Sequence, residues 1–218
     1  MGLGVYHTFL DTFHRKSGRA IASLLVKTKL TPNMVTALST IVAFASAWAF
    51  SEGIYEYIIL GAILFEVSQI LDYADGELAR AKKVDSKYGA WLDEVCDFAK
   101  ETVVLFGITF GVYRMGIMPL LTTWIIGVIA IASLQFRVLV PYANLRYFSS
   151  KSYKKVKGDL GITYKLSRLA ISFIALSMFL FAAINMIHLF LIIYAAYNLL
   201  LAIFSFTYFN SKFRKTHG

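Results

Sequence analysis

Three long stretches of this 218-residue chain contain no Asp, Glu, Lys or Arg. They run from Leu30 to Ser51, from Met115 to Phe136 and from Leu169 to Ser211. A helix needs about 20 mostly apolar residues to cross a bilayer, so the first two stretches suffice for one crossing each and the third for two. We therefore expect membrane-spanning helices, with a break in the third stretch near Asn185.

The overall composition supports this interpretation. Hydrophobic residues make up 58% of the chain and charged residues 16%, whereas soluble domains average about 45–50% apolar and about 25% charged residues. Two further apolar segments, roughly Glu56 to Arg80 and Tyr88 to Tyr113, carry acidic residues at one end. The sequence thus predicts an all-α integral membrane protein with six transmembrane helices.

The residues before the first span have a different pattern, in which Phe9, Phe13 and other apolar residues alternate with Arg15, Lys16 and Arg19. A helix of this kind lies in the membrane interface instead of crossing it. We therefore expect three parts: an interfacial juxtamembrane helix over residues 1–30, a six-helix transmembrane catalytic domain over 31–211 and a cytoplasmic tail over 212–218.

Lysine and arginine are distributed unevenly between the predicted loops. Nineteen of the 22 basic residues fall in segments that six crossings place on one side, namely 1–29, 80–87, 146–168 and the C-terminal tail. The positive-inside rule makes that side cytoplasmic, with both termini and the acidic segment. The net charge of +9 then matches anionic membrane lipids of the cell membrane, and we expect no nucleic-acid partner.

Four aspartates lie where the second and third predicted helices meet, Asp72, Asp75, Asp93 and Asp97. Positions three, four and seven residues apart share a helix face. The face that begins at Asp72 holds Asp75, Gly76, Ala79 and Arg80, and the face that begins at Ser86 holds Gly89, Asp93 and Asp97. Each helix thus offers a pair of carboxylates beside glycine and other small residues.

Convergent carboxylates in a partly dehydrated site need a cation among them. Mg²⁺ and Mn²⁺ prefer carboxylate oxygen, and no His or Cys ligand set accompanies these aspartates. Two such ions would offset four negative charges, and metals with open positions can clamp a phosphate. Arg80 favours a phosphate ligand as well, because a guanidinium donates bidentate hydrogen bonds to phosphate oxygens.

Two other interpretations of these acids stay open at this point. The aspartates could form salt bridges between helices, although Arg80 and the nearby lysines are the only basic residues close to them in sequence. They could also serve a divalent cation or proton transporter. The predicted position at the membrane interface, and the absence of an inverted repeat, favour the transporter less than an enzyme.

The segment Asp72-x2-Asp75-Gly76-x2-Ala79-Arg80-x8-Gly89-x3-Asp93-x3-Asp97 resembles the signature of the CDP-alcohol phosphotransferases. This family consists of integral membrane enzymes with six transmembrane helices and an interfacial N-terminal helix. The resemblance implies that an acceptor hydroxyl attacks the β-phosphorus of a CDP-alcohol and releases CMP. It also implies a homodimer. The segments "DGELAR" and "SKYGAWLD" are most similar to the sequences of the branch that forms inositol phosphodiesters.

Carried over by position, the resemblance assigns roles to individual residues. Asp72, Asp75, Asp93 and Asp97 would bind two Mg²⁺ or Mn²⁺ ions, and Asp97 would also act as the general base. Residues expected to contact the CDP moiety or leave room for it are Gly76, Ala79, Arg80, Ser86 and Gly89. The stretch "LTPNMVT" resembles the family's first-helix start, which implies nucleotide contacts for Pro32, Asn33 and Thr36.

Two further arginines follow the second uncharged stretch, in the predicted fourth helix. Arg137 would lie within the membrane and Arg146 near its boundary. Intramembrane arginines usually face a cavity or a partner, so we expect both to contact an anionic acceptor or the donor phosphate. An alternative is that this basic region binds lipid headgroups.

Overall fold

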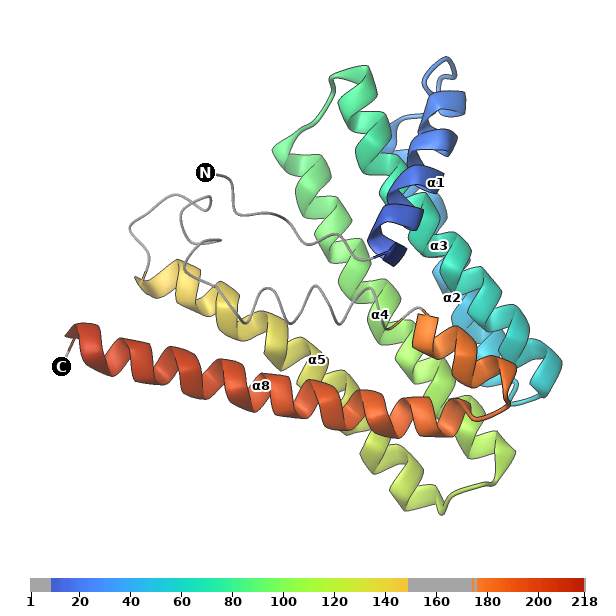
Figure 1. Ribbon diagram of the computed structural model, residues 1–218, viewed down its shortest axis with the longest axis vertical. Coiled ribbons are helices and arrows are strands. Elements are labelled where there is room, and N and C mark those ends of the chain that lie inside the picture. Colours follow the sequence, from blue (N-terminus) through green and yellow to red (C-terminus); the bar gives the residue numbers. More distant parts are fainter. Residues whose placement is uncertain (1–8, 149–173, 175, 218) are drawn as a thin grey trace.

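The computed structural model describes residues 9–148, 174 and 176–217, and the regular elements within these ranges are α-helices (Figure 1). The helices are α1 (Phe9–Leu25), α2 (Pro32–Ser51), α3 (Tyr55–Lys82), α4 (Lys87–Met115), α5 (Leu120–Phe148) and α8 (Ile187–His217). Residues 176–183 form a further, unlabelled helical segment. The predicted all-α fold is confirmed for the part of the chain described.

Local sequence explains where these helices begin and end. Thr31 caps α2 with its side chain, and Pro32 occupies the first helical position, as the sequence predicts. Ser86 caps α4 by accepting a hydrogen bond from the backbone N–H of Gly89. Asn185 has a positive φ of 57° and lies in the turn before α8, which is the break predicted in the last uncharged stretch.

Helix α2 packs against both α3 and α4, and the α2–α4 contact is very close. A methyl group added at Gly107 or Gly111 of α4 would collide with the backbone carbonyls of Ala47 and Phe50 in α2. Small residues allow such backbone approach in membrane helices. The contact holds α2 beside the helices that carry the aspartates.

Helix α1 packs along α3, with contacts toward the C-terminal end of α3 at Tyr73 and Glu77. A methyl group added at Gly18 would lie 2.9 Å from the backbone of Tyr73, so glycine is needed for this contact. The buried ring of His14 stacks on Tyr73, and its Nε2 lies 2.5 Å from Oε1 of Glu66. The predicted N-terminal helix is thus bound to the membrane domain through apolar and charged contacts.

Helices α5 and α8 lie side by side and both pack against α4 (Figure 1). Their contact completes the main core, in which the largest side chains include Phe50, Ile58, Ile108, Leu134 and Leu191. The hydroxyl of Tyr55 donates to the carbonyl oxygen of Ala183 at 2.9 Å, so the turn before α8 lies at the end of the bundle where α3 begins.

Four helices are long and apolar enough to cross a membrane: Pro32–Ser51, Tyr55–Lys82, Leu120–Arg137 and Ile187–Tyr208. The protein is therefore an integral membrane protein, and four of the six predicted spans are confirmed as candidates. Helix α4 has the length but carries Asp93, Asp97, Lys100 and Glu101 in its first half. The remaining predicted span runs from Leu169 to about Asn185. Residues 169–173 and 175 lie outside the described residues, and the helical segment 176–183 alone is too short to cross a bilayer.

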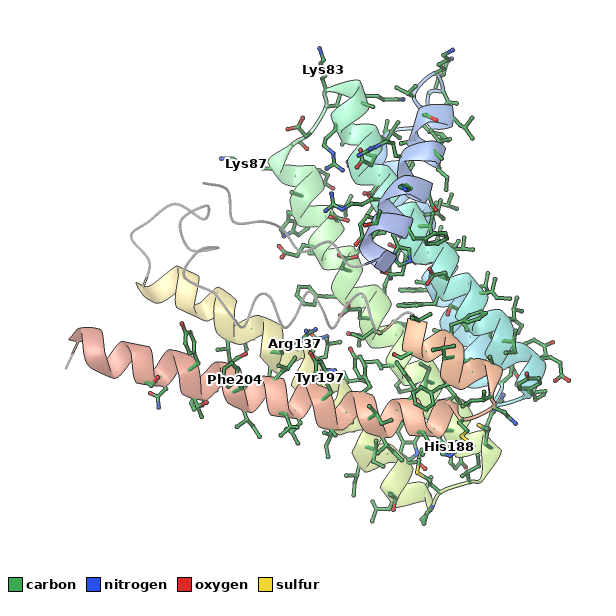
Figure 2. All side chains as sticks on the ribbon, viewed as in Figure 1. Lys83, Lys87, Arg137, His188, Tyr197 and Phe204 are labelled. Atoms are coloured by element: carbon green, nitrogen blue, oxygen red, sulfur yellow. The ribbon has the colours of Figure 1, made fainter. Side chains whose placement is uncertain are left out.

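The two ends of the bundle differ in charge. At one end, Nζ of Lys82 lies 2.8 Å from the carbonyl oxygens of both Thr28 and Leu30, which joins the α3–α4 turn to the α1–α2 connection. Lys83 and Lys87 extend from the same turn (Figure 2). At the other end, Arg114 pairs with Glu52 at 2.8 Å. Lys82, Lys83 and Lys87 thus lie together at the end where α3 meets α4.

The α2–α4 contact yields a stability prediction. Gly111→Ala should lower the free energy of unfolding by at least about 1–3 kcal/mol, because the added methyl group meets the backbone of Phe50 and not a movable side chain. Thermal unfolding in detergent measures this effect. Ala45→Val adds bulk to the exposed face of α2 and should have little effect; equal losses in both variants would contradict the packing argument.

Candidate metal and nucleotide site

Three of the four predicted aspartates converge between α3 and α4. Asp72 and Asp75 of α3 and Asp93 of α4 each offer a carboxylate oxygen, and these oxygens all lie within 4.8 Å of one another. Oδ1 of Asp93 is buried and has no hydrogen-bond partner among the described residues. Hard oxygen donors at this spacing, one of them unsatisfied, fit a divalent cation such as Mg²⁺ or Mn²⁺.

A side chain of helix α2 hydrogen-bonds to one of these three aspartates. Asp75 is only 5% exposed, and Oγ1 of the buried Thr36 donates to its Oδ2 at 2.5 Å. Thr36 was expected to line the nucleotide pocket, and the structure gives it this additional contact with a candidate metal ligand. A buried carboxylate with a defined partner keeps one oxygen in a fixed direction.

Asp97 occupies a different position from the other three aspartates. Its Oδ1 lies 2.7 Å from Nζ of Lys100, which also pairs with Oδ1 of Asp72. The Asp97 side chain is 48% exposed, so it can meet a molecule from outside the cluster. Lys100 was not predicted to belong to the site, although its spacing three residues after Asp97 could have indicated it.

An open pocket adjoins the aspartates at the end where α3 meets α4. It is lined by Pro32, Asn33, Thr36, Asp75, Gly76, Ala79, Arg80, Val84, Asp85, Ser86, Gly89, Ala90 and Asp93. Every residue that the sequence assigns to the nucleotide therefore lines one pocket. Its volume of about 210 Å³ lies below the range of about 300–1,000 Å³ for pockets that enclose a whole ligand, so it suits part of a larger molecule.

The guanidinium of Arg80 lines this pocket and is largely exposed. A methyl group added at Gly76 would lie 3.5 Å from Nη1 of Arg80, so the guanidinium lies against the glycine. Oε1 of Glu77 lies 3.1 Å from Nη2 of Arg80 and 3.6 Å from Nη2 of Arg19 in α1. Glu77 lies off the Asp72 face, and its position next to Arg80 was not anticipated.

Two helix N-termini meet at the same pocket. Pro32 and Asn33 belong to the first turn of α2, and Ser86 and Gly89 lie at the start of α4. A methyl group at Gly89 would lie 3.2 Å from Oγ of Ser86 and 3.5 Å from Oδ1 of Asn33, so glycine keeps this entrance open. The partial positive charge of helix N-termini favours an anionic ligand.

Arg137 lies deeper, on α5 and close to Tyr197 of α8 (Figure 2). It is 6% exposed, and its Nε and Nη1 make no hydrogen bonds within the described part of the chain. Glu101 interacts electrostatically with Arg137, Lys100 and Asp72, which connects the arginine to the aspartate site. Arg146 belongs to α5, but its side chain lies outside the described residues.

The sequence matches the CDP-alcohol phosphatidyltransferase family over residues 29–208. This range covers most of the chain and includes the aspartate cluster and the pocket. The protein belongs to the CDP-alcohol phosphatidyltransferase family, which confirms the resemblance found in the sequence.

Curated relatives come from the inositol branch of this family. The chain is 33% identical over 145 residues to a bifunctional IPC transferase and DIPP synthase of Aquifex aeolicus, covering 66% of this chain and 31% of the relative. It is 34% identical over 94 residues to an archaetidylinositol phosphate synthase of Pyrococcus horikoshii, covering 43% and 46%. The chain thus spans between a third and a half of these relatives.

Solved structures share the fold. The phosphatidylinositol phosphate synthase of Mycobacterium tuberculosis with CDP-DAG bound superposes with a TM-score of 0.67 at 21% identity, covering 87% of this chain and 92% of that one. The same enzyme with manganese and citrate gives a TM-score of 0.64 at 19% identity, with 88% of each chain covered.

Proposed function

We propose that this protein is an enzyme that transfers a substituted phosphate group from a CDP-alcohol to the hydroxyl of an acceptor alcohol and releases CMP. One observation carries the proposal: three convergent aspartates adjoin a pocket lined by all the residues that the family signature assigns to the nucleotide. The names of the inositol-branch relatives favour a role in phospholipid or inositol phosphodiester synthesis.

Asp72, Asp75 and Asp93 would hold the divalent metal, Mg²⁺ or Mn²⁺. The manganese in a structure of similar fold and the oxygen-only donor set support this assignment. When bound, the metal neutralises phosphate charge and stabilises the charge that develops during transfer. The family signature implies two ions, with Asp97 as a further ligand. In the structure Asp97 contacts the ammonium of Lys100, and this contact affects how many metal ions the site can hold.

The pocket would bind the CDP moiety of the donor. Arg80 and Ser86 lie where they can donate to diphosphate oxygens, and the two helix N-termini add to the attraction. Gly76, Ala79 and Gly89 leave room for the nucleotide next to Pro32, Asn33 and Thr36. Because the pocket holds only part of such a molecule, the alcohol of the donor would extend beyond it, toward lipid or toward a site for a CDP-linked inositol.

Asp97 would act as the general base. Its carboxylate would take the proton of the acceptor hydroxyl while the hydroxyl oxygen forms a bond to the β-phosphorus of the donor. The bond from that phosphorus to the oxygen bridging the two phosphates then breaks, and CMP leaves with the bridging oxygen. The exposure of Asp97 outside the three-aspartate group supports this role, since a base must reach the acceptor.

Arg137 and Arg146 would contact an anionic acceptor or the donor phosphate. The buried guanidinium of Arg137 has two nitrogen atoms without hydrogen bonds in the described part of the protein, and an acceptor phosphate would satisfy them. An inositol-type acceptor is favoured by the names of the relatives. For Arg146 and the basic segment that follows, lipid headgroup binding stays an alternative.

For the arrangement in the membrane, we propose six crossings, with α4 and the segment before Asn185 completing the four candidate spans. Both termini and the site would face the cytoplasm, because the lysine-rich turn between α3 and α4 marks the positive side. A homodimer embedded in membrane lipids is the expected assembly by family resemblance.

The base assignment predicts that Asp97→Asn abolishes CMP release while CDP still binds. Amide replaces carboxylate with almost no change in shape, so the variant loses the proton acceptor but keeps the pocket residues. Purified protein in detergent is assayed for CMP release with Mg²⁺ or Mn²⁺. CDP-diacylglycerol, CDP-archaeol and CDP-inositol are each paired with inositol, inositol phosphate, glycerol phosphate and serine.

The matched control is Glu94→Gln, because Glu94 is an exposed acid on the same helix, next to Asp93 but outside the cluster. It should retain release. Turnover by Asp97→Asn at the wild-type rate would refute the base role. If no pair of substrates releases CMP and CDP does not bind, the enzyme assignment fails, and a divalent cation or proton transporter becomes the better account of the aspartates.

The acceptor assignment predicts that Arg137→Gln raises KM for the acceptor by about tenfold or more, as expected for loss of a charge-assisted hydrogen bond. KM for the donor should change little. Steady-state CMP release gives both constants. Arg114→Gln, at the opposite end of the bundle and paired with Glu52, is the control and should change neither. An unchanged acceptor KM in a folded Arg137→Gln protein would contradict the assignment.

A further inference from the structure

Lys100 is a buried cation inside a group of acids that the family signature assigns to metals. Its side chain is 1% exposed. The ammonium contacts Oδ1 of Asp72 and Oδ1 of Asp97, and lies 3.4 Å from Oγ of Ser39 in α2. An ammonium has three N–H donors, so these three oxygens can use all of them.

Ser39 is held in place for this contact. Its hydroxyl donates to the backbone oxygen of Thr36 at 2.9 Å, and its own backbone oxygen accepts from the hydroxyl of Ser68 at 2.9 Å. Both serines are fully buried. Polar groups from α2, α3 and α4 therefore surround the ammonium of Lys100 and hold it in one position.

The positions of the four aspartates separate Asp97 from the three that can bind one metal ion together. Asp72, Asp75 and Asp93 present oxygens within 4.8 Å of one another, and Asp93 also has a buried oxygen, Oδ1, with no hydrogen-bond partner among the described residues. Asp97 is outside the group and is joined to Asp72 through Lys100. The ammonium of Lys100 lies between the carboxylates of Asp72 and Asp97.

We propose that this site holds one divalent ion, bound by Asp72, Asp75 and Asp93, and that Lys100 supplies the second positive charge between Asp72 and Asp97. This inference rests on the proposed metal site and revises the expected number of ions from two to one. A second ion would have to displace a buried ammonium from its carboxylates, and a buried charge without a partner is strongly unfavourable.

The proposed arrangement also gives Lys100 a positioning role for the general base. Its ammonium fixes one oxygen of Asp97 and keeps the carboxylate beside the metal-binding aspartates. A lysine cannot exchange ligands or leave open coordination positions as a metal can. The donor phosphates would therefore bind the single ion on the pocket side, next to Asp75 and Asp93, which line the pocket.

The number of Mn²⁺ ions per chain tests this directly. Metal-free protein in detergent is titrated with Mn²⁺, bound metal is counted by elemental analysis after desalting, and electron paramagnetic resonance reports whether ions are coupled. One ion per chain with the spectrum of an isolated Mn²⁺ is expected. Two ions per chain with a spin-coupled spectrum would overturn the inference and leave the proposed enzyme intact. No bound Mn²⁺ would overturn the metal site itself.

Two variants assign the effect to Lys100. Lys100→Met keeps a long side chain but removes the charge, and it should bind two Mn²⁺ ions per chain with spin coupling. The control is Lys82→Met. In the described part of the chain, the hydrogen bonds of Lys82 go to backbone oxygens of the α1–α2 connection, so this variant should still bind one Mn²⁺ ion per chain. A folded Lys100→Met protein with one ion would contradict the role of Lys100, and the wild-type count remains decisive if this variant does not fold.

Discussion

Repulsion between carboxylates at the edge of a membrane protein is the constraint on which the rest of this structure depends. Four aspartates near the junction of α3 and α4 can stay charged only when cations lie among them. Lys100 provides one such charge from within the fold, and the geometry of Asp72, Asp75 and Asp93 fits a divalent ion that provides the rest. The charged aspartates can therefore come together only if cations bind among them.

Helix α2 positions the charged groups of the site through hydrogen bonds from its own side chains. It can lie close to α4 because Gly107 and Gly111 present no side chains to its backbone. From that position Thr36 reaches Asp75 and Ser39 reaches Lys100. The first turn of α2 also forms one wall of the pocket. Close packing of α2 and α4 near one end of the bundle thus helps to determine the geometry of the polar groups near the other end.

Much of this architecture could be predicted because its signals are local in sequence. Uncharged stretches marked the spans, Thr31 and Pro32 marked a helix start, and Asn185 marked a break, since each depends on residues within a turn or two. The helical spacing of the aspartates likewise predicted their shared faces. The family signature then named the pocket residues, and the structure brings all of them to one pocket.

The interactions that were missed are those that depend on tertiary packing. Lys100 was not predicted to belong to the site, because its contact with Asp72 requires α3 and α4 to be placed against each other. The same is true of the contact between Glu77 of α3 and Arg19 of α1. Among the described residues, four of the six predicted spans meet the composition expected of a membrane helix. Helix α4 does not, because it combines the length of a span with the charges of the site, and the span before Asn185 is described only in part.

The central claim is that the aspartate cluster and the pocket form a single metal-dependent site for a CDP-alcohol. The most direct test is the affinity of the purified wild-type protein for CDP, measured by calorimetry with Mn²⁺ and again after removal of divalent metal by EDTA. The account predicts that CDP binds with Mn²⁺ and that binding is lost, or weakened by at least about tenfold, without it. Equal affinity in both conditions would show that the pocket binds nucleotide independently of the aspartates and would contradict the account.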